Sequence, residues 1–184
     1  MISEAGIRQR GTFFLVAAAA LVLDQTTKLL ADAYLRGHGP VEVVPRVFNL
    51  WYSTNAGGLF GYFSQWPAPW RGVLLTLMPL LAIVLIVVIL LRSDPRDRIT
   101  LMGLSLILGG AVGNLIDRVL RGEVVDFLDM YVPPSGLANR LVSWFGTAHW
   151  PTFNFADSAI VVGAGFLLVS VVRKPSPDPA HGGD

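Results

Sequence analysis

Four apolar stretches recur along the 184-residue chain, and each is long enough to cross a lipid bilayer as a helix. They cover residues 11–35, 73–91, 99–116 and 159–172, the last together with the preceding FNFADS (153–158). Residues 73–91 are the clearest case, because at 1.5 Å per residue they form a helix about 28 Å long, which matches the hydrocarbon core. The pattern therefore predicts four membrane-spanning helices.

The first stretch admits a second interpretation. Arg8 and Arg10 precede an apolar run, as they would in a secretory signal peptide. However, the small residues 17–20 lie inside the run instead of after it, and the helical pattern continues past Lys28. We therefore interpret residues 11–35 as an uncleaved first span.

The two long connections between the spans carry structural signals of their own. Residues 41–54 are rich in β-branched and aromatic side chains and partly alternate, which predicts strand structure interrupted at Pro45. In the second connection, Leu137, Leu141 and Trp144 recur at helical spacing, which predicts a short interfacial helix or flap.

The composition supports a single integral membrane domain. The chain is 53% hydrophobic and 15% charged, with a mean hydropathy of +0.56, and is too short for more than one compact unit. We expect one membrane domain over residues 1–173 and a disordered, proline- and glycine-rich tail over residues 174–184. Nothing in the sequence requires more than a monomer. The net charge of +1, without a basic stripe, argues against nucleic acid as a partner.

Four spans place both termini on one side of the membrane. Basic residues are denser in the short segments on the side of the membrane that holds the termini. The positive-inside rule therefore predicts cytoplasmic termini and extracytoplasmic long connections. Asp117 then lies about 27 Å along the third span, and Asp157 lies about 24 Å from the end of the fourth. Both reach the outer face, and Asp24 approaches it from the first span, about 20 Å along.

Five carboxylates lie within or at the ends of these apolar segments. They are Asp24, Asp117, Asp126, Asp129 and Asp157. An ionised side chain at such a depth is costly, so acids retained there are usually functional. Asp126 stands between two apolar neighbours, which would raise its pKa, whereas we expect Asp129 to be more exposed.

Some of these acids also have a structural interpretation. Asp117 could form an ion pair with Arg118 at the end of the third span, and for Asp117 we favour this interpretation. Asp157 could cap the last helix. Capping does not explain why two acids converge at one face.

Two carboxylates in a partly dry site share a proton, so that one acts as a base and the other as an acid. Such a pair can activate water against a peptide carbonyl without a metal or a covalent intermediate. The chain has no cysteine, GxSxG or HExxH, which disfavours thiol, serine and zincin-type hydrolases. His38 and His149 lie in the connections, where we expect them to be solvated. We expect no metal and no cofactor.

The residues leave a second function open. Membrane-buried acids with arginine and asparagine partners also build proton-coupled transporters, and a small carrier could use Asp24, Asp117 and Asp157. Against this alternative, the acids gather at one face, and the sequence shows no internal repeat of the kind that many transporters carry.

Five segments, taken in order, resemble the signature blocks of the bacterial lipoprotein signal peptidases, the type II signal peptidases. They are DQTTK (24–28), TNAGGLFG (54–61), GNLIDR (113–118), VVDFLD (124–129) and FNFADSAI (153–160). The resemblance covers residues 11–173. It implies a membrane-embedded all-α fold of four spanning helices with a small extracytoplasmic β-cradle. It also implies an aspartic peptidase of the bacterial cytoplasmic membrane that removes the signal peptide of prolipoproteins before their diacylglyceryl-modified cysteine.

Block matching also implies the site residues. The catalytic pair falls on Asp126 and Asp157. Residues that would orient this pair or the substrate, or brace the fold, are Asn55, Gly57, Asn114, Arg118, Asn154, Asp24, Lys28 and Asp117. The implied partners are diacylglyceryl-modified prolipoproteins, membrane lipids and globomycin-type lipopeptide inhibitors. One departure is the connection between the two catalytic positions, which is longer than expected of the family and leaves the shape of the flap open.

Overall fold

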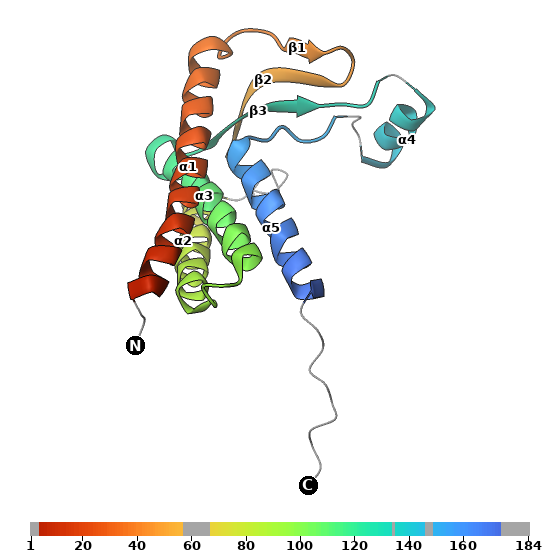
Figure 1. Cartoon of the computed structure of the whole chain (residues 1–184). Coiled ribbons are helices and arrows are strands. Elements are labelled where there is room, and N and C mark those ends of the chain that lie inside the picture. The colour runs from red at the N-terminus through yellow and green to blue at the C-terminus, as the bar shows by residue number, and fades with distance from the viewer. Residues whose placement is uncertain (1–3, 57–66, 134, 146–148, 174–184) are drawn as a thin grey trace.

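A computed structural model of the chain describes residues 4–56, 67–133, 135–145 and 149–173. Four of its helices are long and apolar enough to cross a membrane, namely α1 (Glu4–Tyr34), α2 (Ala68–Arg92), α3 (Arg98–Arg121) and α5 (Phe155–Arg173). A small antiparallel sheet and the short helix α4 (Gly136–Phe145) lie at one end of the bundle, which we call the sheet end (Figure 1). The predicted architecture of four membrane-spanning helices with a small sheet is confirmed.

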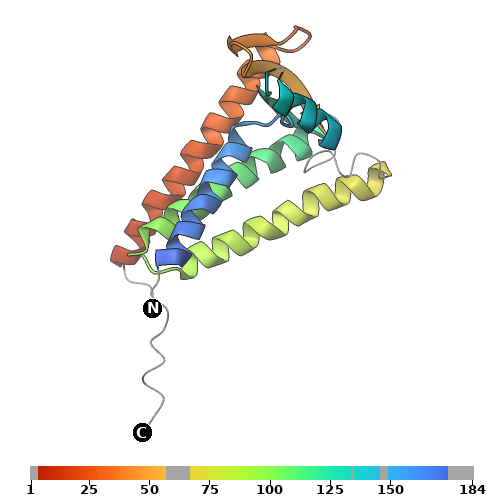
Figure 2. The same ribbon diagram turned by 90° about the vertical axis from the view of Figure 1, so that its right-hand side faces the viewer.

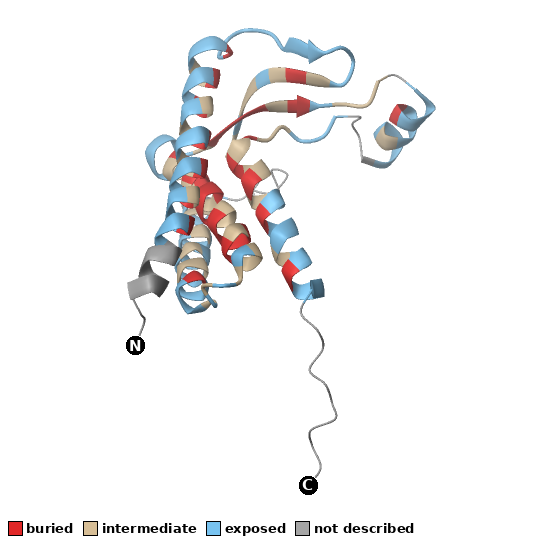
Figure 3. Cartoon of the chain, viewed as in Figure 1, coloured by how far each residue is buried: buried red, intermediate tan, exposed pale blue. Residues whose placement is uncertain are grey.

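α3 is the central helix of the bundle, and α1, α2 and α5 all pack against it. Glycines bring the backbones close together, since a Cβ atom on Gly163 of α5 would lie 2.6 Å from the carbonyl oxygen of Gly103. A Cβ atom on Gly110 would likewise collide with the carbonyl oxygen of Ala156. Such contacts between small residues let helices associate within a bilayer. Accordingly, buried residues concentrate where α3 and α5 face each other (Figure 3).

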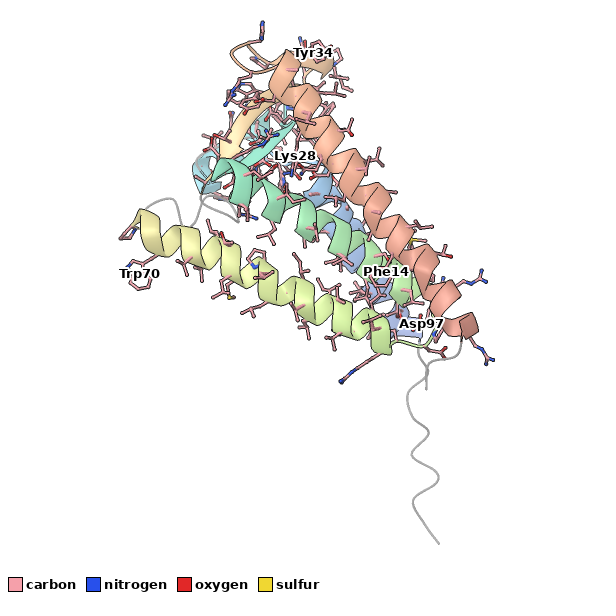
Figure 4. All side chains as sticks on the ribbon, turned by 90° about the vertical axis from the view of Figure 1, so that its left-hand side faces the viewer. Phe14, Lys28, Tyr34, Trp70 and Asp97 are labelled. Atoms are coloured by element: carbon pink, nitrogen blue, oxygen red, sulfur yellow. The ribbon has the colours of Figure 1, made fainter. Side chains whose placement is uncertain are left out.

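α2 departs from the rest of the bundle toward the sheet end (Figure 2). Its last turns are anchored, because Leu90 is fully buried in a cluster with Leu101 and Leu104 of α3. Trp70 marks the opposite, diverging end of the helix (Figure 4). Most side chains of α2 are exposed and apolar, as expected of a helix that faces lipid.

The sheet has the order β1 (Val41–Val44), β2 (Phe48–Asn55) and β3 (Val124–Met130). Pro45 falls in the turn between β1 and β2, so the predicted strand structure and its interruption are confirmed. β3 was not predicted, because nearly all of its residues are buried and the strand lacks the alternation that marks a half-exposed strand. Val125 and Phe127 pack against Ala31 and Leu35 at the end of α1, which docks the sheet onto the helices.

The connection after β3 contains α4, which confirms the predicted helix. Its residues Leu137, Val142 and Trp144 are exposed, and the role of this helix at the membrane interface stays a prediction. The connection returns to the sheet through bridges between Tyr131 and His149 and between Leu128 and Phe153.

The expectation that Asp129 is exposed was wrong. The residue is 1% exposed. Its carboxylate accepts a hydrogen bond from Nδ2 of Asn49 (2.9 Å) and lies 3.0 Å from Nδ1 of His149, so these two side chains cover it. His149 is half-exposed and stacks on the ring of Tyr131, so it is not simply solvated as we expected. Both partners come from segments distant in sequence, which explains why the local pattern did not reveal the burial of Asp129.

α1 begins and α5 ends at the same end of the bundle, opposite the sheet end (Figure 1). This arrangement agrees with the prediction that an even number of spans places both termini on one side. The predicted tail over residues 174–184 and the predicted support Gly57 lie outside the described residues.

Candidate active site

The two predicted catalytic acids meet at the sheet end, where β3 passes the beginning of α5. Asp126 lies on β3 opposite Ser53 of β2, and Asp157 lies in the first turn of α5. Asn154 connects them, because its Nδ2 donates to Oδ1 of Asp126 (2.7 Å) while its Oδ1 accepts from the backbone N–H of Asp157 (3.0 Å). The structure therefore brings both acids to one asparagine.

Asn154 and Asp157 form a reciprocal cap at the start of α5. The backbone N–H of Asn154 donates to Oδ2 of Asp157 (3.3 Å), and the backbone N–H of Asp157 donates to Oδ1 of Asn154 (3.0 Å). This is the capping-box arrangement, in which the cap residue and the third helical residue satisfy each other. The structural alternative for Asp157 was therefore wrong in detail, since the cap is Asn154. Asp157 keeps Oδ1 for another donor, Nδ2 of Asn114 (2.8 Å).

Asp126 is almost fully buried, with 2% of the residue exposed. Burial, followed by the negative charge of Asp157, raises the pKa of Asp126 to about 7. Hydrogen bonds from Asn154 and Asn55 and the positive charge of Lys28 oppose the rise only in part. The predicted direction of the shift is confirmed. Asp157 is half-buried, so the pair combines a dry acid with one that water and substrate can reach.

A buried ionic cluster lies beside the pair, between α1 and α3. Nζ of Lys28 is 2.9 Å from Oδ2 of Asp24, 3.0 Å from Oδ2 of Asp117 and 2.8 Å from Oδ1 of Asn114. All three charged side chains are 0% exposed. Figure 4 shows Lys28 on α1 near the sheet end, where α1, α3 and the sheet converge.

The cluster also joins the elements that carry the acids. Asp24 accepts from the backbone N–H of Ala156 at the start of α5 (3.0 Å), and Asp117 accepts from that of Val125 on β3 (3.3 Å). Buried charges are tolerated when paired and hydrogen-bonded in this way, whereas removal of one partner is strongly destabilising. The cluster therefore sets the position of both strand and helix relative to α1 and α3.

The ion pair predicted between Asp117 and Arg118 is replaced by other pairs. Asp117 contacts Lys28 and, at 3.7 Å, Nε of Arg121 one turn further along α3. Adjacent residues of a helix point about 100° apart, so Arg118 faces a different direction from Asp117. Its NH1 donates to the carbonyl oxygen of Asn114 (3.4 Å), and its buried Nε has no hydrogen-bond partner among the described residues.

One supporting residue was not singled out from the sequence. Nε2 of Gln25 donates to Oδ2 of Asp24 (3.0 Å) and to the carbonyl oxygen of Gly113 (3.1 Å), so it joins α1 to α3 beside the cluster. Its position within the DQTTK block was the only signal. Asn55 also contacts Asp126, as its position in the TNAGGLFG block suggested. Within the described residues, no three His, Asp or Glu side chains are arranged to hold a metal ion.

Known proteins resemble this chain over most of its length. The family model described as signal peptidase (SPase) II matches residues 16–173. The chain belongs to the signal peptidase II family. The lipoprotein signal peptidase of Syntrophus aciditrophicus (strain SB) is 37% identical over 88% of this chain and 92% of its own length. That of Geobacter metallireducens (strain ATCC 53774 / DSM 7210 / GS-15) is 39% identical over 88% of this chain and 90% of its own.

The fold is also shared with solved structures of bacterial membrane enzymes. One, determined by the in meso method at 2.3 Å, has a TM-score of 0.72 at 24% identity and covers 91% of this chain and 94% of its own. Another, determined by the same method at 1.9 Å, has a TM-score of 0.71 at 25% identity. The match covers 90% of this chain and 95% of that protein's chain.

Family membership decides between the two functions that the residues left open. The chain is a multi-pass membrane peptidase of lipoprotein processing, and signal peptidase II enzymes remove signal peptides from prolipoproteins. A carrier would need acids spread across the membrane as a relay, whereas Asp24, Asp117, Asp126 and Asp157 gather at the sheet end.

Proposed function

We propose that this peptidase cuts prolipoproteins directly before their diacylglyceryl-modified cysteine, with Asp126 and Asp157 as an aspartate dyad that activates water. The observation that carries the proposal is the convergence of both carboxylates on Asn154, one from β3 and one from the first turn of α5. Asn154 bonds to the side chain of one and the backbone of the other. The shared asparagine supports the proposal, because both acids lie within hydrogen-bonding distance of one residue.

Two carboxylates that share one proton divide the chemistry of peptide hydrolysis between them. The ionised member removes a proton from water, and the protonated member donates its proton to the carbonyl oxygen of the scissile bond. The partly exposed Asp157 and the buried Asp126 provide unlike environments, and unlike environments separate acid and base roles.

We propose that Arg118 binds the backbone of the substrate. Its side chain is half-buried at the sheet end of α3, and its Nε–H has no hydrogen-bond partner among the described residues. An unsatisfied buried donor beside a reaction centre is available to a carbonyl oxygen that becomes negative during the attack. We assign Arg118 this role, and we assign Asn55, Asn114, Asp24, Lys28 and Asp117 to support of the dyad.

The diverging helix α2 offers the lipid part of the substrate a place beside the bundle. An apolar cavity of about 310 Å³ lies along its beginning, lined by Pro67, Trp70, Val73, Leu74, Leu77 and Met78. A lipidated precursor keeps its acyl chains in the bilayer, and a site at the helix ends reaches its scissile bond without extracting it. Binding of these remote parts would position the peptide bond for attack.

We further propose that the enzyme lies in the bacterial cytoplasmic membrane, with cytoplasmic termini and an extracytoplasmic sheet end. Basic residues support this orientation, because Arg92, Arg96, Arg98 and Arg173 lie where α2 and α5 end and α3 begins, opposite the sheet end. The other implied partners, membrane lipids and globomycin-type lipopeptides that occupy the dyad, belong to the same proposal, as does action as a monomer.

The substrate class is tested with the purified full chain in detergent and two forms of one prolipoprotein. One form carries the diacylglyceryl group on its cysteine and the other does not. We expect only the modified form to be shortened, with the modified cysteine as its new N-terminus by mass spectrometry. Equal cleavage of both forms would contradict recognition of the lipid, and an intact modified precursor would contradict the proposed function.

The pH dependence of cleavage follows from the environment of Asp126. Because burial raises its pKa from 3.8 to about 7, Asp126 holds its proton at pH 6 and loses it as the pH rises through about 7. With both members ionised the dyad lacks its acid, so we expect the rate to fall about tenfold per pH unit above that point. The free energy of unfolding changes in the same direction. The part of it that comes from the higher pKa of Asp126 in the folded state is present below about pH 4 and is lost as the pH rises to about 7.

Initial rates measured from pH 5.5 to 9 would show the decline. Enzyme held at pH 9 and returned to pH 6 before the assay serves as the control for irreversible unfolding. A rate that stays constant or increases up to pH 9 would contradict the assignment of a protonated Asp126.

A further inference from the structure

Asn114 lies between a buried cation and the dyad. Its Oδ1 accepts a hydrogen bond from Nζ of Lys28 (2.8 Å), and its Nδ2 donates to Oδ1 of Asp157 (2.8 Å). Lys28 is 0% exposed, and its remaining contacts are with Asp24 and Asp117. An unbroken chain of side-chain hydrogen bonds therefore runs from the ammonium group to one carboxylate of the dyad.

The chemistry of Lys28 determines how the amide of Asn114 is oriented. An ammonium group has three N–H donors and no acceptor, so only the oxygen of Asn114 can face it. The amide nitrogen must then face Asp157. Polarisation of the Asn114 carbonyl by the buried cation also makes this N–H a stronger donor, because neighbouring hydrogen bonds reinforce one another at low dielectric.

Asp157 is thereby surrounded by donors. Oδ1 accepts from Asn114 (2.8 Å) and Oδ2 accepts from the backbone N–H of Asn154 (3.3 Å), so both oxygens face an N–H group. Asp157 also lies in the first turn of α5, where the helix dipole favours a negative charge. Hydrogen bonds to an ionised carboxylate favour that form.

Asp126 also accepts hydrogen bonds, from Asn154 and Asn55, but it is more deeply buried than Asp157. It is buried between apolar neighbours on β3, and burial raises its pKa to about 7. Asn154 donates to its Oδ1 (2.7 Å) and also to Oδ1 of Asn114 (3.2 Å), so the hydrogen bonds from Lys28 reach Asp126 only through two asparagines, whereas they reach Asp157 through one. A single proton shared by the dyad is therefore more stable on Asp126 than on Asp157.

We propose that Lys28 is a positioning residue that acts through Asn114 to keep Asp157 ionised, so that Asp157 is the general base and Asp126 holds the catalytic proton. This assignment rests on the dyad proposed above, and it adds which member has which role and what decides it.

The roles give a balanced reaction. Asp157 removes a proton from water as the water oxygen bonds to the scissile carbonyl carbon, and Asp126 gives its proton to the carbonyl oxygen. In the tetrahedral diol that results, Asp157 passes its proton to the amide nitrogen as the C–N bond breaks. A hydroxyl of the diol returns its proton to Asp126 as the new carboxylic acid forms. Both members end in the state in which they began.

Several charged groups lie around the dyad on the elements packed against it. They are Asp24 and Lys28 of α1 and Asp117 and Arg118 of α3. The guanidinium of Arg118 interacts with both members of the dyad, so the test must separate its contribution from that of Lys28.

The first test replaces Lys28 by methionine, which removes the charge and the donor at similar length. We expect the acid limb of the kcat–pH profile to move up by about one pH unit, a tenfold loss of ionised Asp157 on that limb, with KM unchanged. The matched control is Arg36→Met, which removes a basic side chain just beyond α1 that is 63% exposed and pairs with Asp32. We expect its profile to match wild type.

Asn114→Leu interrupts the hydrogen bonds between Lys28 and Asp157 without removing the positive charge. It keeps the test possible if Lys28→Met does not fold. We expect the same shift of the acid limb, and no further shift in the double variant, because both residues act along one path. Two additive shifts, or an acid limb that does not move in either variant although activity falls, would overturn the proposal. The second outcome would show that Lys28 only supports the fold.

Infrared spectroscopy at pH 5 assigns the proton without substrate. We expect the carboxylic acid C=O band of the dyad to persist in Asp157→Asn and to disappear in Asp126→Asn. Adding Asn114→Leu to Asp126→Asn leaves Lys28 paired with Asp24 and Asp117, and it should restore an acid band. Further addition of Asp157→Asn should remove that band, which assigns it to Asp157. Loss of the band in Asp157→Asn alone, or no response to Asn114→Leu, would overturn the assignment. If the wild type cut no lipidated precursor, the proposed function would fail, and this measurement would still decide where the proton lies.

Discussion

Asparagine at position 126 or 157 is expected to abolish cleavage of a lipidated precursor while the protein still folds and inserts. The amide is nearly isosteric with the carboxyl group, so the packing of β3 and α5 is retained. Asparagine can neither take a proton from water nor supply one to the carbonyl oxygen. Loss of a general acid or base lowers rates by about 10²–10⁴-fold, and loss of the water-activating pair places the effect at the upper end of this range.

Asp129→Asn is the matched control for this experiment. Asp129 lies on the same strand as Asp126 and is equally buried, but its partners are Asn49 and His149. We expect Asp129→Asn to cleave the precursor at a rate close to wild type. All variants would be compared by gel shift at equal concentrations of folded protein, judged by size-exclusion chromatography. Substantial cleavage by Asp126→Asn or Asp157→Asn would sink the dyad assignment.

Alanine at Gly163 is expected to lower the free energy of unfolding by about 1–3 kcal/mol and to reduce activity with it. The new Cβ atom would lie 2.6 Å from the carbonyl oxygen of Gly103 and 2.7 Å from the side chain of Ile107. Because one obstacle is backbone, α5 must move away from α3. Asp157 begins the same helix, so the movement also displaces half of the dyad.

The neighbouring glycine of α5 provides a closely matched control. A Cβ atom on Gly165 would meet no atom within 4 Å, so Gly165→Ala should leave stability and activity close to wild type. Thermal unfolding in detergent, followed by circular dichroism, and cleavage rates per folded molecule would compare the two variants. Equal stability of Gly163→Ala and Gly165→Ala would show that the close contact between α3 and α5 is not needed.

Local sequence patterns identified the elements whose signals are local. The membrane spans were predicted from hydropathy and length. The turn at Pro45 was predicted because proline interrupts a strand. β3 was not predicted, because burial on both faces removes the alternation of apolar and polar residues that marks a strand. The burial of Asp129 was not predicted, because its partners Asn49 and His149 lie elsewhere in the chain. The pairing of Asp117 with Arg118 was misjudged because adjacent helical residues diverge.

The candidate site was found from the sequence by two routes of unequal power. Position within or beside an apolar segment singled out five acids, but it could not distinguish a structural acid from a catalytic one. The five are Asp24, Asp117, Asp126, Asp129 and Asp157. The five blocks implied Asp126 and Asp157 as the pair, with Asn154 among the supports. That Asn154 caps α5 and contacts both acids became evident only from the structure.

The sequence by itself determined that this chain has four helices able to cross the membrane and that it resembles the type II signal peptidases, and it supplied the acids that we propose as catalytic. The tertiary structure alone decided which groups touch. Asn154 and Asp126 are 28 residues apart, Lys28 and Asn114 are 86 apart, and Ala156 and Asp24 are 132 apart. Hydrogen bonds require contact within about 3 Å, and spacing along a chain does not specify distances between packed elements. Those distances are set where the glycines of α3 admit α1 and α5, and they place a buried lysine where it can act on the dyad.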